Sequence, residues 1–576
     1  METGLRGETG GRSPREILWS IGEEAIRSCD AARSVTRAVG VEPGRITLGG
    51  RPVRAVPPGR LIVLAIGKAA ESMYEAFRAR LAAAGSKRPV RALIVHPAGS
   101  PKVVAAKDAP RVALGHEQVT TIAGEHPVPG KGSMRAGTAA LRLLASARSG
   151  DDVVALVSGG GSALLEAPLV PFITPKELER LHQVLVVSGA PIGAINTVRK
   201  HLSALKGGRL AALARQARSL STLIVCDVDL ERYEEVASGP TVPDRTTLDD
   251  MVEAVSHYGL APALPERVLE GLRGARLPET PKPKDPIFKR AKSILLLSNL
   301  DLRNAAVRGG LARGLSAEAM PTEITGPVDE TVEMVARAIE GAPTGLRLLV
   351  LGGETRTVAP AGGQGGRAQD LALRLALRMR NLSVRGWAFV STGSDGKDGS
   401  SPAAGAFVDS STLERVRGMG IDPEKVLERG DSYKLFHRLG DALVTGPTGT
   451  NVRDLYLLLT GLPRRDRPEA QPTPAAPRPP SIVVPGWRPT VTPPSPIRVV
   501  RPAPRPLLPT APRPPAARKP TAPRKPAAPK SRAARKSSAS RKPPRSGRAT
   551  KAVKVKRSGG KPRPRPRRGA RTRRRR

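Results

Sequence analysis

Cysteine is scarce in this sequence, and long apolar runs are absent. The two cysteines, Cys29 and Cys226, are too few for a disulfide framework, so a reducing cytoplasm is the simplest location. No apolar run reaches the ~18 residues that a membrane-spanning helix needs. Residues 1–15 contain no apolar stretch of the kind found in signal peptides. We therefore expect a cytoplasmic protein without a transmembrane segment.

Acidic residues are almost missing from the last fifth of the chain. Residues 463–576 contain 35 Lys and Arg against 2 Asp and Glu, which places +33 of the net charge of +44 in this tail. Pro, Ala, Arg and Lys dominate there, and such a composition cannot bury a core while its like charges repel one another. The sequence therefore predicts a disordered basic tail with polyproline II character, which follows a mildly basic globular body.

The tail also has only one aromatic residue, Trp487. Base stacking is therefore not expected to dominate nucleic-acid binding, which would depend on phosphate contacts and would be independent of sequence and steeply salt-dependent. Composition leaves two other roles open, a solubilising tail or one attracted to anionic membranes or polyphosphate. We favour non-specific binding of DNA or RNA through residues 463–576, which would associate the protein with the nucleoid.

The body of the chain is predicted to form two α/β domains. A Pro- and charge-rich stretch at 275–292 predicts a linker between a first domain at 13–274 and a second at 293–462, and residues 1–12 form an N-terminal extension. Short apolar runs that end in small-residue turns predict buried strands. These strands are expected at residues 61–66, 92–95, 153–157, 223–226, 293–298, 346–351 and 386–390.

The beginning of the body carries a helix start signal. Ser13 suits the N-cap, Pro14 the first helical position and Glu16 the third. We expect this helix to continue to about Val35.

A glycine-rich turn after the strand at 153–157 is the first candidate site. Glycine reaches positive φ angles and lets a ligand approach the backbone closely, and such a turn can direct several N–H groups at one anion. A flexible turn is the alternative interpretation. The candidate phosphate- or carboxylate-binding residues are Ser158, Gly159, Gly160, Gly161 and Ser162.

Charged residues occur at two further strand ends of the first domain. Lys68 lies in the turn after residues 61–66, at the carboxyl edge of the sheet where open α/β folds bind ligands; a solvated surface lysine is the alternative. Asp227 follows residues 223–226 and suits a metal ion or a hydroxyl group, or else a helix cap.

One predicted helix carries an amide and two cations at spacings of three and four. Asn196, Arg199 and Lys200 would share one face with Ser203. This face could bind an anion, or it could be a solvated basic surface.

The second domain offers a phosphate-binding loop and a pair of carboxylates. Gly365 and Gly366 precede Arg367 at the start of a helix, where N–H groups, the helix dipole and a guanidinium all favour phosphate; a flexible surface loop is the alternative. Asp395 and Asp398 could hold Mg²⁺ or form an Asp-Gly turn.

The set and order of these motifs resembles the glycerate 2-kinase family, whose C-terminal part is called the MOFRL domain. The resemblance covers about residues 14–460 and excludes the tail. It rests on Gly67-Lys68-Ala69, Glu125-His126-Pro127-Val128-Pro129, Ser158-Gly159-Gly160-Gly161-Ser162-Ala163-Leu164, Asn196-Thr197-Val198-Arg199-Lys200-His201-Leu202-Ser203, Ala237-Ser238-Gly239-Pro240-Thr241, Gly353-Glu354-Thr355, Gly365-Gly366-Arg367 and Thr445-Gly446-Pro447-Thr448-Gly449-Thr450-Asn451-Val452.

The resemblance implies a fold and an activity. The family transfers the γ-phosphate of ATP to the 2-hydroxyl of D-glycerate with Mg²⁺, and a Rossmann-like N-terminal domain and a smaller α/β MOFRL domain flank its cleft. Lys68 resembles the family's catalytic lysine, Arg367 its second-domain arginine and Asp227 the aspartate of its Ser-Asp-Val motif. Lys68 and Arg367 would stabilise the transferred phosphoryl group, and Asp227 would orient the attacking hydroxyl or hold Mg²⁺.

Some positions depart from the family pattern. The usual Ser-Asp-Val-x-Gly-Asp is Cys226-Asp227-Val228-Asp229-Leu230-Glu231, the usual Asn after Arg367 is Ala368, and a late Asp is replaced by Pro402. These changes keep a second hypothesis open, in which the chain is a non-catalytic member that acts with nucleic acid, or a kinase for another small hydroxy acid.

Overall fold

The computed structural model describes residues 12–54, 59–98, 116–357, 360, 362–382 and 386–462. The tail predicted at 463–576 and residues 1–11 of the predicted extension lie outside the described residues. Among the described residues, no helix has the length and apolar character needed to cross a membrane.

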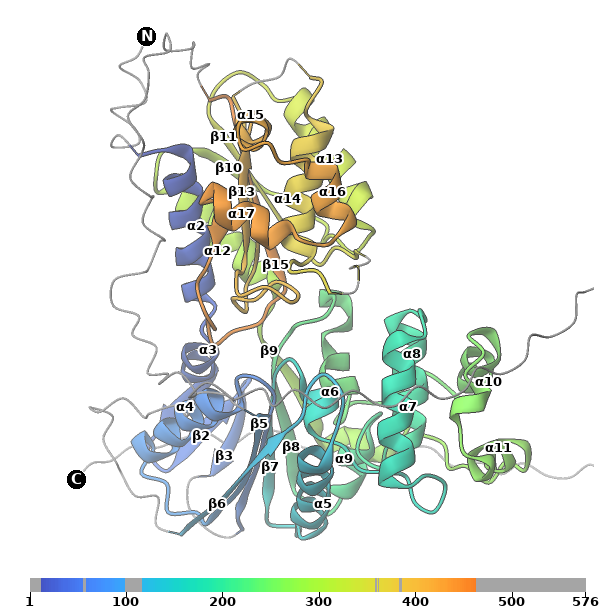
Figure 1. The fold of residues 1–576 in the computed structure, drawn as a ribbon. Helices are drawn as coiled ribbons and strands as arrows, with labels where there is room; N and C mark the ends of the chain where they lie inside the picture. The colour runs from blue at the N-terminus through green and yellow to red at the C-terminus, as the bar shows by residue number, and fades with distance from the viewer. Residues whose placement is uncertain are drawn as a thin grey trace, which may run out of the picture. The chain divides into compact units, whose positions relative to one another are not determined.

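The first sheet is parallel and has the strand order β6-β5-β4-β7-β8-β9 (Figure 1). Every residue of β4 and β7 is buried, as expected for parallel strands with both faces covered, and this explains their uninterrupted apolar sequences. The strands are β4 Leu61–Ile66, β5 Val90–Pro97, β6 Glu117–Gly124, β7 Asp152–Val157, β8 Ser219–Val225 and β9 Ala291–Leu297.

Helices and short turns connect these strands. The helices close to the sheet are α4 Ala70–Ala83, α5 Lys131–Ala145, α6 Gly161–Leu164 and α9 Arg209–Leu213, with 3-10 helices η1 Leu230–Ser238 and η3 Pro286–Arg290. A small antiparallel sheet precedes them, formed by β1 Val39–Glu42, β2 Arg45–Leu48 and β3 Arg51–Arg54.

The predicted boundary between the two domains is misplaced. The strand expected at 293–298 as the first of the second domain is β9, and it pairs in parallel with β8 of the first sheet. The Pro-rich stretch before it is therefore a crossover within the first domain and not a domain linker. The first sheet ends only at Leu297.

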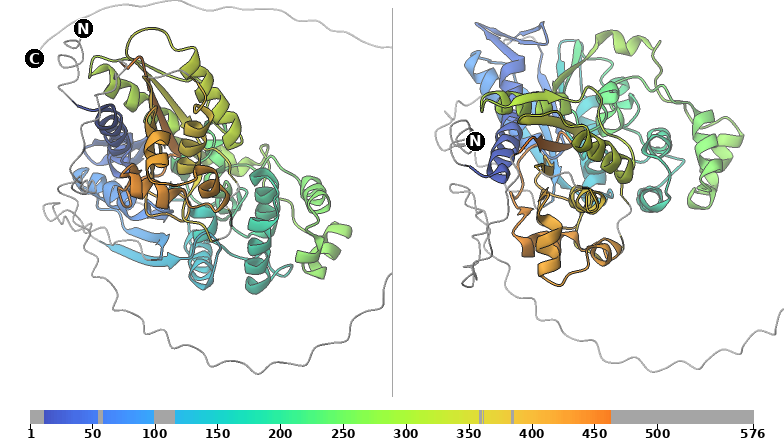
Figure 2. Two further views of the ribbon diagram at one scale, coloured as in Figure 1. Left: turned by 45° about the horizontal axis from the view of Figure 1, so that its top comes forward. Right: turned by 90° about the horizontal axis from the view of Figure 1, so that it is seen from above.

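Four further helices form a cluster with its own core. They are α7 Pro175–Val187, α8 Ile192–Leu202, α10 Leu248–His257 and α11 Glu266–Arg273, and both views of Figure 2 show them beside the first sheet. The buried apolar face of α8 includes Ile195, Val198 and Leu202. Packing of this face fixes the direction of the polar residues between them.

The second sheet is mixed and has the strand order β10-β11-β15-β12-β13-β14. Its central strand β15 is antiparallel to both neighbours, β11 and β12. The strands are β10 Ser316–Ala319, β11 Arg347–Gly353, β12 Ala388–Gly393, β13 Gly405–Asp409, β14 Ala442–Leu443 and β15 Asp454–Thr460; the helices are α12 Asn299–Leu311, α13 Val328–Glu340, α14 Arg367–Arg378, α15 Thr412–Gly418, α16 Pro423–Glu428 and α17 Ser432–Leu439.

The single helix predicted from Ser13 to Val35 is two helices. The capping box at Ser13 is present and starts α2, Pro14–Ser28. The chain then breaks at Cys29, because the Asp30 side chain accepts from the N–H of Arg33 and starts α3, Ala31–Ala38. Helix α2 packs against α12 and β15 of the second sheet, whereas α3 packs against α4 and β9.

Candidate active site

The glycine-rich turn after β7 is joined to the turn after β4. The backbone N–H of Lys68 donates to the carbonyl of Gly159 at 2.9 Å, and the Ser158 hydroxyl accepts from the N–H of Ala69 at 3.1 Å. Gly160 has φ +86°, a left-handed conformation that favours glycine. The two turns therefore form one continuous surface at the carboxyl edge of the first sheet.

Lys68 and Asp227 meet at this surface, as their positions at strand ends predicted. A Cβ at Gly159 would lie 2.3 Å from the Asp227 carboxylate, so only glycine lets β8 bring this carboxylate to the turn. Burial raises the pKa of Asp227, and the nearby charge of Lys68 lowers it. A half-buried carboxylate beside a lysine can accept a proton or hold a cation.

Lys68 also contacts the loop that follows β12. Its Nζ lies 2.9 Å from Oδ2 of Asp395, and both side chains are partly exposed. The Lys68 ammonium therefore has one partner in each of the two sheets, Asp227 nearby and Asp395 in direct contact. It stands where an anionic group would meet it from solvent.

Arg367 begins α14 and is held by two carboxylates of the second sheet. Its Nε lies 2.7 Å from Oδ2 of Asp454, and its Nη1 donates to Glu354. Burial would lower the pKa of Arg367, but Asp454 and Glu354 raise it above its ordinary value. Burial raises the pKa of Glu354, and Asp227 raises it further, which places Asp227 within electrostatic range of this pair.

Sequence reasoning missed Arg453, which connects the loop after β8 with residues of the second part of the chain. Its Nη1 lies 2.8 Å from Oδ1 of Asp229 and 2.6 Å from Oε2 of Glu323, and its side chain is 6% exposed. Its φ is +70°, an unusual conformation for a non-glycine residue. The only local signal was an Arg directly before Asp454, since the partner carboxylates are 130 and more residues away.

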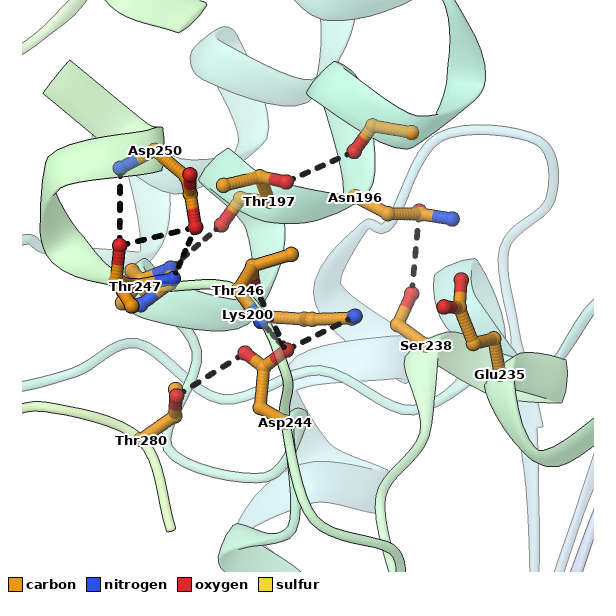
Figure 3. Close-up of polar contacts among 12 residues, drawn as sticks. Asn196, Thr197, Lys200, Glu235, Ser238, Asp244, Thr246, Thr247, Asp250 and Thr280 are labelled. Atoms are coloured by element: carbon orange, nitrogen blue, oxygen red, sulfur yellow. Dashed lines mark hydrogen bonds and ion pairs between the residues drawn. The ribbon is translucent and has the colours of Figure 1, made fainter. Parts of the chain in front are cut away.

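Lys200 does not share a ligand-facing surface with Asn196 and Arg199, contrary to the prediction. Its Nζ lies 3.1 Å from Oδ1 of Asp244, and both side chains are buried. Asp244 also accepts from the hydroxyls of Thr246 and Thr280, so it is the centre of a closed network (Figure 3). Lys200 therefore anchors α8 to the loop before α10.

Asn196 lies on the side of α8 that faces the glycine-rich turn. The Ser238 hydroxyl donates to its Oδ1 at 3.4 Å and lies 2.8 Å from the hydroxyl of Ser162. In Figure 3 the Asn196 amide nitrogen points away from Ser238. Ser162 and Asn196 are thus brought close to each other through a serine of η1.

Asp398 is placed as a helix cap and not as a metal ligand. Its carboxylate accepts from the N–H groups of Ala368 and Gln369 at 3.1 and 2.9 Å, at the start of α14. Burial raises the pKa of Asp398 to about 7, and these donors oppose the shift. A Cβ at Gly366 would lie 2.2 Å from this carboxylate, so Gly366 is required for the cap.

Glycine is also needed at position 365 for packing, because a Cβ there would lie 2.2 Å from the hydroxyl of Ser432.

Among the residues described here, no group of three or more His, Cys, Asp or Glu side chains could hold a metal ion. The two carboxylates predicted to hold Mg²⁺ each have another partner in this structure, Lys68 for Asp395 and the N–H groups of α14 for Asp398.

Comparison with known proteins covers almost the whole described body. Residues 17–273 match the family described as Domain of unknown function (DUF4147), and residues 347–454 match the MOFRL family. A protein of Agrobacterium vitis named putative hydroxypyruvate reductase is 35% identical over 78% of this chain and 95% of its own length. Glycerate 2-kinase of Pyrococcus horikoshii is 34% identical over 77% of this chain and 97% of its own.

A solved structure of a glycerate kinase also shares the fold of this chain. The crystal structure of glycerate kinase from Thermotoga maritima aligns with a TM-score of 0.62 and 30% identity, covering 77% of this chain and 99% of that one. This likeness confirms the expected fold class, two α/β domains with a parallel sheet in the first. The chain belongs to the glycerate 2-kinase family, whose members are phosphotransferases with an alcohol group as acceptor.

Proposed function

We propose that this chain transfers the γ-phosphate of ATP to the 2-hydroxyl of D-glycerate, giving 2-phosphoglycerate and ADP. The observation that carries the proposal is the meeting of Lys68, Asp227 and the glycine-rich turn at one sheet edge, within electrostatic range of Glu354 and Arg367. Relatives named glycerate 2-kinase and glycerate kinase support the assignment.

The roles follow from the charge that phosphoryl transfer develops. The transferred group carries its charge on equatorial oxygens, so catalysis depends on positioning and on neutralising these oxygens. Lys68 would neutralise them from the first sheet and Arg367 from the second. Asp227 would act at the acceptor hydroxyl, either by orienting it directly or through a bound Mg²⁺.

Mg²⁺ fits this site through Asp227. Magnesium is usually held by one or two carboxylates, several waters and the substrate's own phosphate oxygens, and Asp227 is a carboxylate at a strand end beside the glycine-rich turn. When bound there, the ion would neutralise phosphate charge. The residue of this chain that would hold it is Asp227, since Asp395 is paired with Lys68.

The test is ADP release with ATP, Mg²⁺ and D-glycerate. We expect turnover by the full chain and by residues 1–462, and loss of turnover in Lys68→Ala with little change in the unfolding temperature. Lys434→Ala, an exposed lysine that pairs with Asp431, is the matched control. Near-normal turnover in Lys68→Ala would overturn the assignment.

A parallel assay separates the two activities that the relatives' names suggest. NADH oxidation with hydroxypyruvate, in the absence of ADP release from ATP and D-glycerate, would overturn the kinase proposal and favour a reductase. Absence of both activities, with ATP still bound, would favour another hydroxy acid or a non-catalytic member.

For the tail, we propose non-specific binding of DNA or RNA through residues 463–576. Its charge of +33 supports the proposal, because each neutralised phosphate releases counterions. The full chain should bind duplex DNA with a logarithmic affinity that falls linearly and steeply with logarithmic salt concentration, and residues 1–462 should lose this binding. Equal binding by the shortened chain would contradict the proposal, and preference for anionic vesicles over DNA would assign the tail to membranes.

A further inference from the structure

Arg199 is a buried arginine without a partner. Its exposed fraction is 9%, and its guanidinium makes no hydrogen bond or ion pair with any residue that the structure describes. Burial lowers the pKa of Arg199, and the charge of Glu166 opposes this only in part. A buried charge without a partner is costly for the folded state, which suggests that its partner is a ligand.

Glu166, the carboxylate whose charge acts on Arg199, already has other partners. Glu166 is fully buried and accepts from Lys206, from Nε2 of His182 at 3.0 Å and from the Ser203 hydroxyl at 2.5 Å. Its two oxygens are therefore occupied by other donors. The guanidinium of Arg199 remains available for an anion from outside.

The surroundings of Arg199 offer further donors to such an anion. Asn196 lies one helical turn before it on α8, and long side chains on a helix lean toward its N-terminus, so Arg199 extends over the turn that carries Asn196. The Asn196 amide nitrogen donates to no other described residue, and Figure 3 shows it pointing away from Ser238.

This group continues the surface that holds Lys68. Through Ser238, Asn196 is connected to Ser162, two residues after Gly160, whose added Cβ would lie 3.6 Å from the Lys68 side chain. Asn196 and the turn of Lys68 therefore border one continuous surface. A ligand group bound at the α8 end of this surface would meet a planar guanidinium and an amide, the geometry that suits a carboxylate.

We propose that Arg199, assisted by Asn196, binds the carboxylate of the acceptor and makes the site specific for a small hydroxy acid over an uncharged polyol. The inference rests on the proposed kinase function for the identity of the acceptor. In this proposal the adjacent cation, Lys200, does not contact the substrate, because Asp244 already neutralises its charge.

The experiment compares D-glycerate with its neutral amide, D-glyceramide, in the full chain. We expect Arg199→Met to raise the Kd and KM for D-glycerate by about 10–100-fold, the loss typical of a charge-assisted hydrogen-bonded pair, while the KM for ATP is unchanged. The preference of the wild-type protein for D-glycerate over D-glyceramide should fall by the same factor. Arg199→Lys, which keeps the charge but not the fork, should be intermediate.

Stability distinguishes a binding role from a structural one. Because the guanidinium has no partner in the fold, Arg199→Met should leave the unfolding temperature unchanged or raised. Arg218→Met is the control. Arg218 directly precedes β8 and pairs with Asp152, and in this variant Asp152 would still pair with Arg88. The variant should leave the Kd for D-glycerate unchanged.

Three results would overturn the inference. They are an unchanged Kd for D-glycerate in Arg199→Met, a lowered unfolding temperature with unchanged discrimination, and a wild-type protein that does not bind D-glycerate. Binding that depends on Arg199 without any ADP release would instead overturn the proposed kinase function and leave the carboxylate site in place.

Discussion

Arg453 shows how single residues connect the two sheets. Its left-handed backbone conformation costs of order 1–3 kcal/mol and persists only where the surroundings determine it. Here Asp229 follows β8 of the first sheet, whereas Glu323 lies in the second part of the chain, and one guanidinium nitrogen contacts both. Its Nε faces Glu354 at 3.6 Å, and Glu354 in turn holds Arg367. Arg453 thus links the loop of Asp229 to the side chain proposed to bind phosphate.

His182 and Glu166 give the fold a dependence on pH. Burial lowers the pKa of His182, whereas the unfolded chain takes up this proton with an ordinary pKa of about 6.5. Protonation therefore favours unfolding as the pH falls below about 6.5. Despite burial, Lys206 and His182 lower the pKa of Glu166 to about 2, so its contribution is present above about pH 4.3 and is lost as the pH falls toward 2.

We expect the free energy of unfolding to fall between pH 7 and pH 5, and His182→Gln to show a smaller fall, because glutamine does not titrate yet can still donate to Glu166. Urea denaturation at pH 7, 6 and 5 measures both slopes. Identical slopes in the two proteins would contradict the assignment to His182.

Among single residues, the sequence predicted best those whose position is set locally. Lys68 and Asp227 each follow an apolar strand, and parallel strands place their carboxyl ends at one edge. The roles of Lys200 and Asp398 were not predictable, because their partners, Asp244 and the N–H groups of α14, come close only in the folded chain. Whether a cation faces a ligand or a buried carboxylate depends on such distant pairs.

Among the helices and strands, α2 packs against elements that are distant from it in the sequence. It begins the described chain, yet its buried face contacts α12 and β15 of the second sheet. Leu18 and Ile21 on this face are fully buried, and Arg15 extends to Asp441 at 2.9 Å. The capping box predicted where α2 begins, but no local pattern identifies the sheet that its apolar face covers.

We expect Leu18→Ala to lower the free energy of unfolding by about 2–5 kcal/mol, the range for a buried leucine in a core that relaxes incompletely. Arg27→Ala on the same helix, an exposed residue that pairs with Glu23, should change it by less than about 0.5 kcal/mol. Urea denaturation followed by circular dichroism measures both. Equal small effects would mean that α2 is not part of the core.

For the whole body, the fold class was predictable because the central strands β4 and β7 are apolar runs that end in glycine-containing turns, whereas the edge strand β6 is largely polar and was not predicted. The division into domains was not, because β9 follows a long Pro-rich crossover and returns to the first sheet. Strand order depends on pairing between distant segments, and an apolar run contains no information about its neighbour.

The contact between Lys68 and Asp395 bears on ligand binding by both parts of the body. An incoming phosphate competes with Asp395 for Lys68, so Asp395→Asn should lower the Kd for ATP by up to about five-fold, the value of a partly exposed ion pair. Isothermal titration in the presence and absence of Mg²⁺ measures this. Weaker binding that appears only with Mg²⁺ would contradict the competition and show that Asp395 holds the ion.

The packing of α2 on β15 has a consequence for biosynthesis. The helix leaves the ribosome first, whereas β15, at Asp454–Thr460, is made more than 400 residues later. Until then β11 and β12 lack the strand that separates them, and the part of the apolar face of α2 that packs on β15 has no partner. A nascent chain in this state exposes surface that chaperones recognise, so the yield of folded protein should depend on chaperones much more than its final stability suggests.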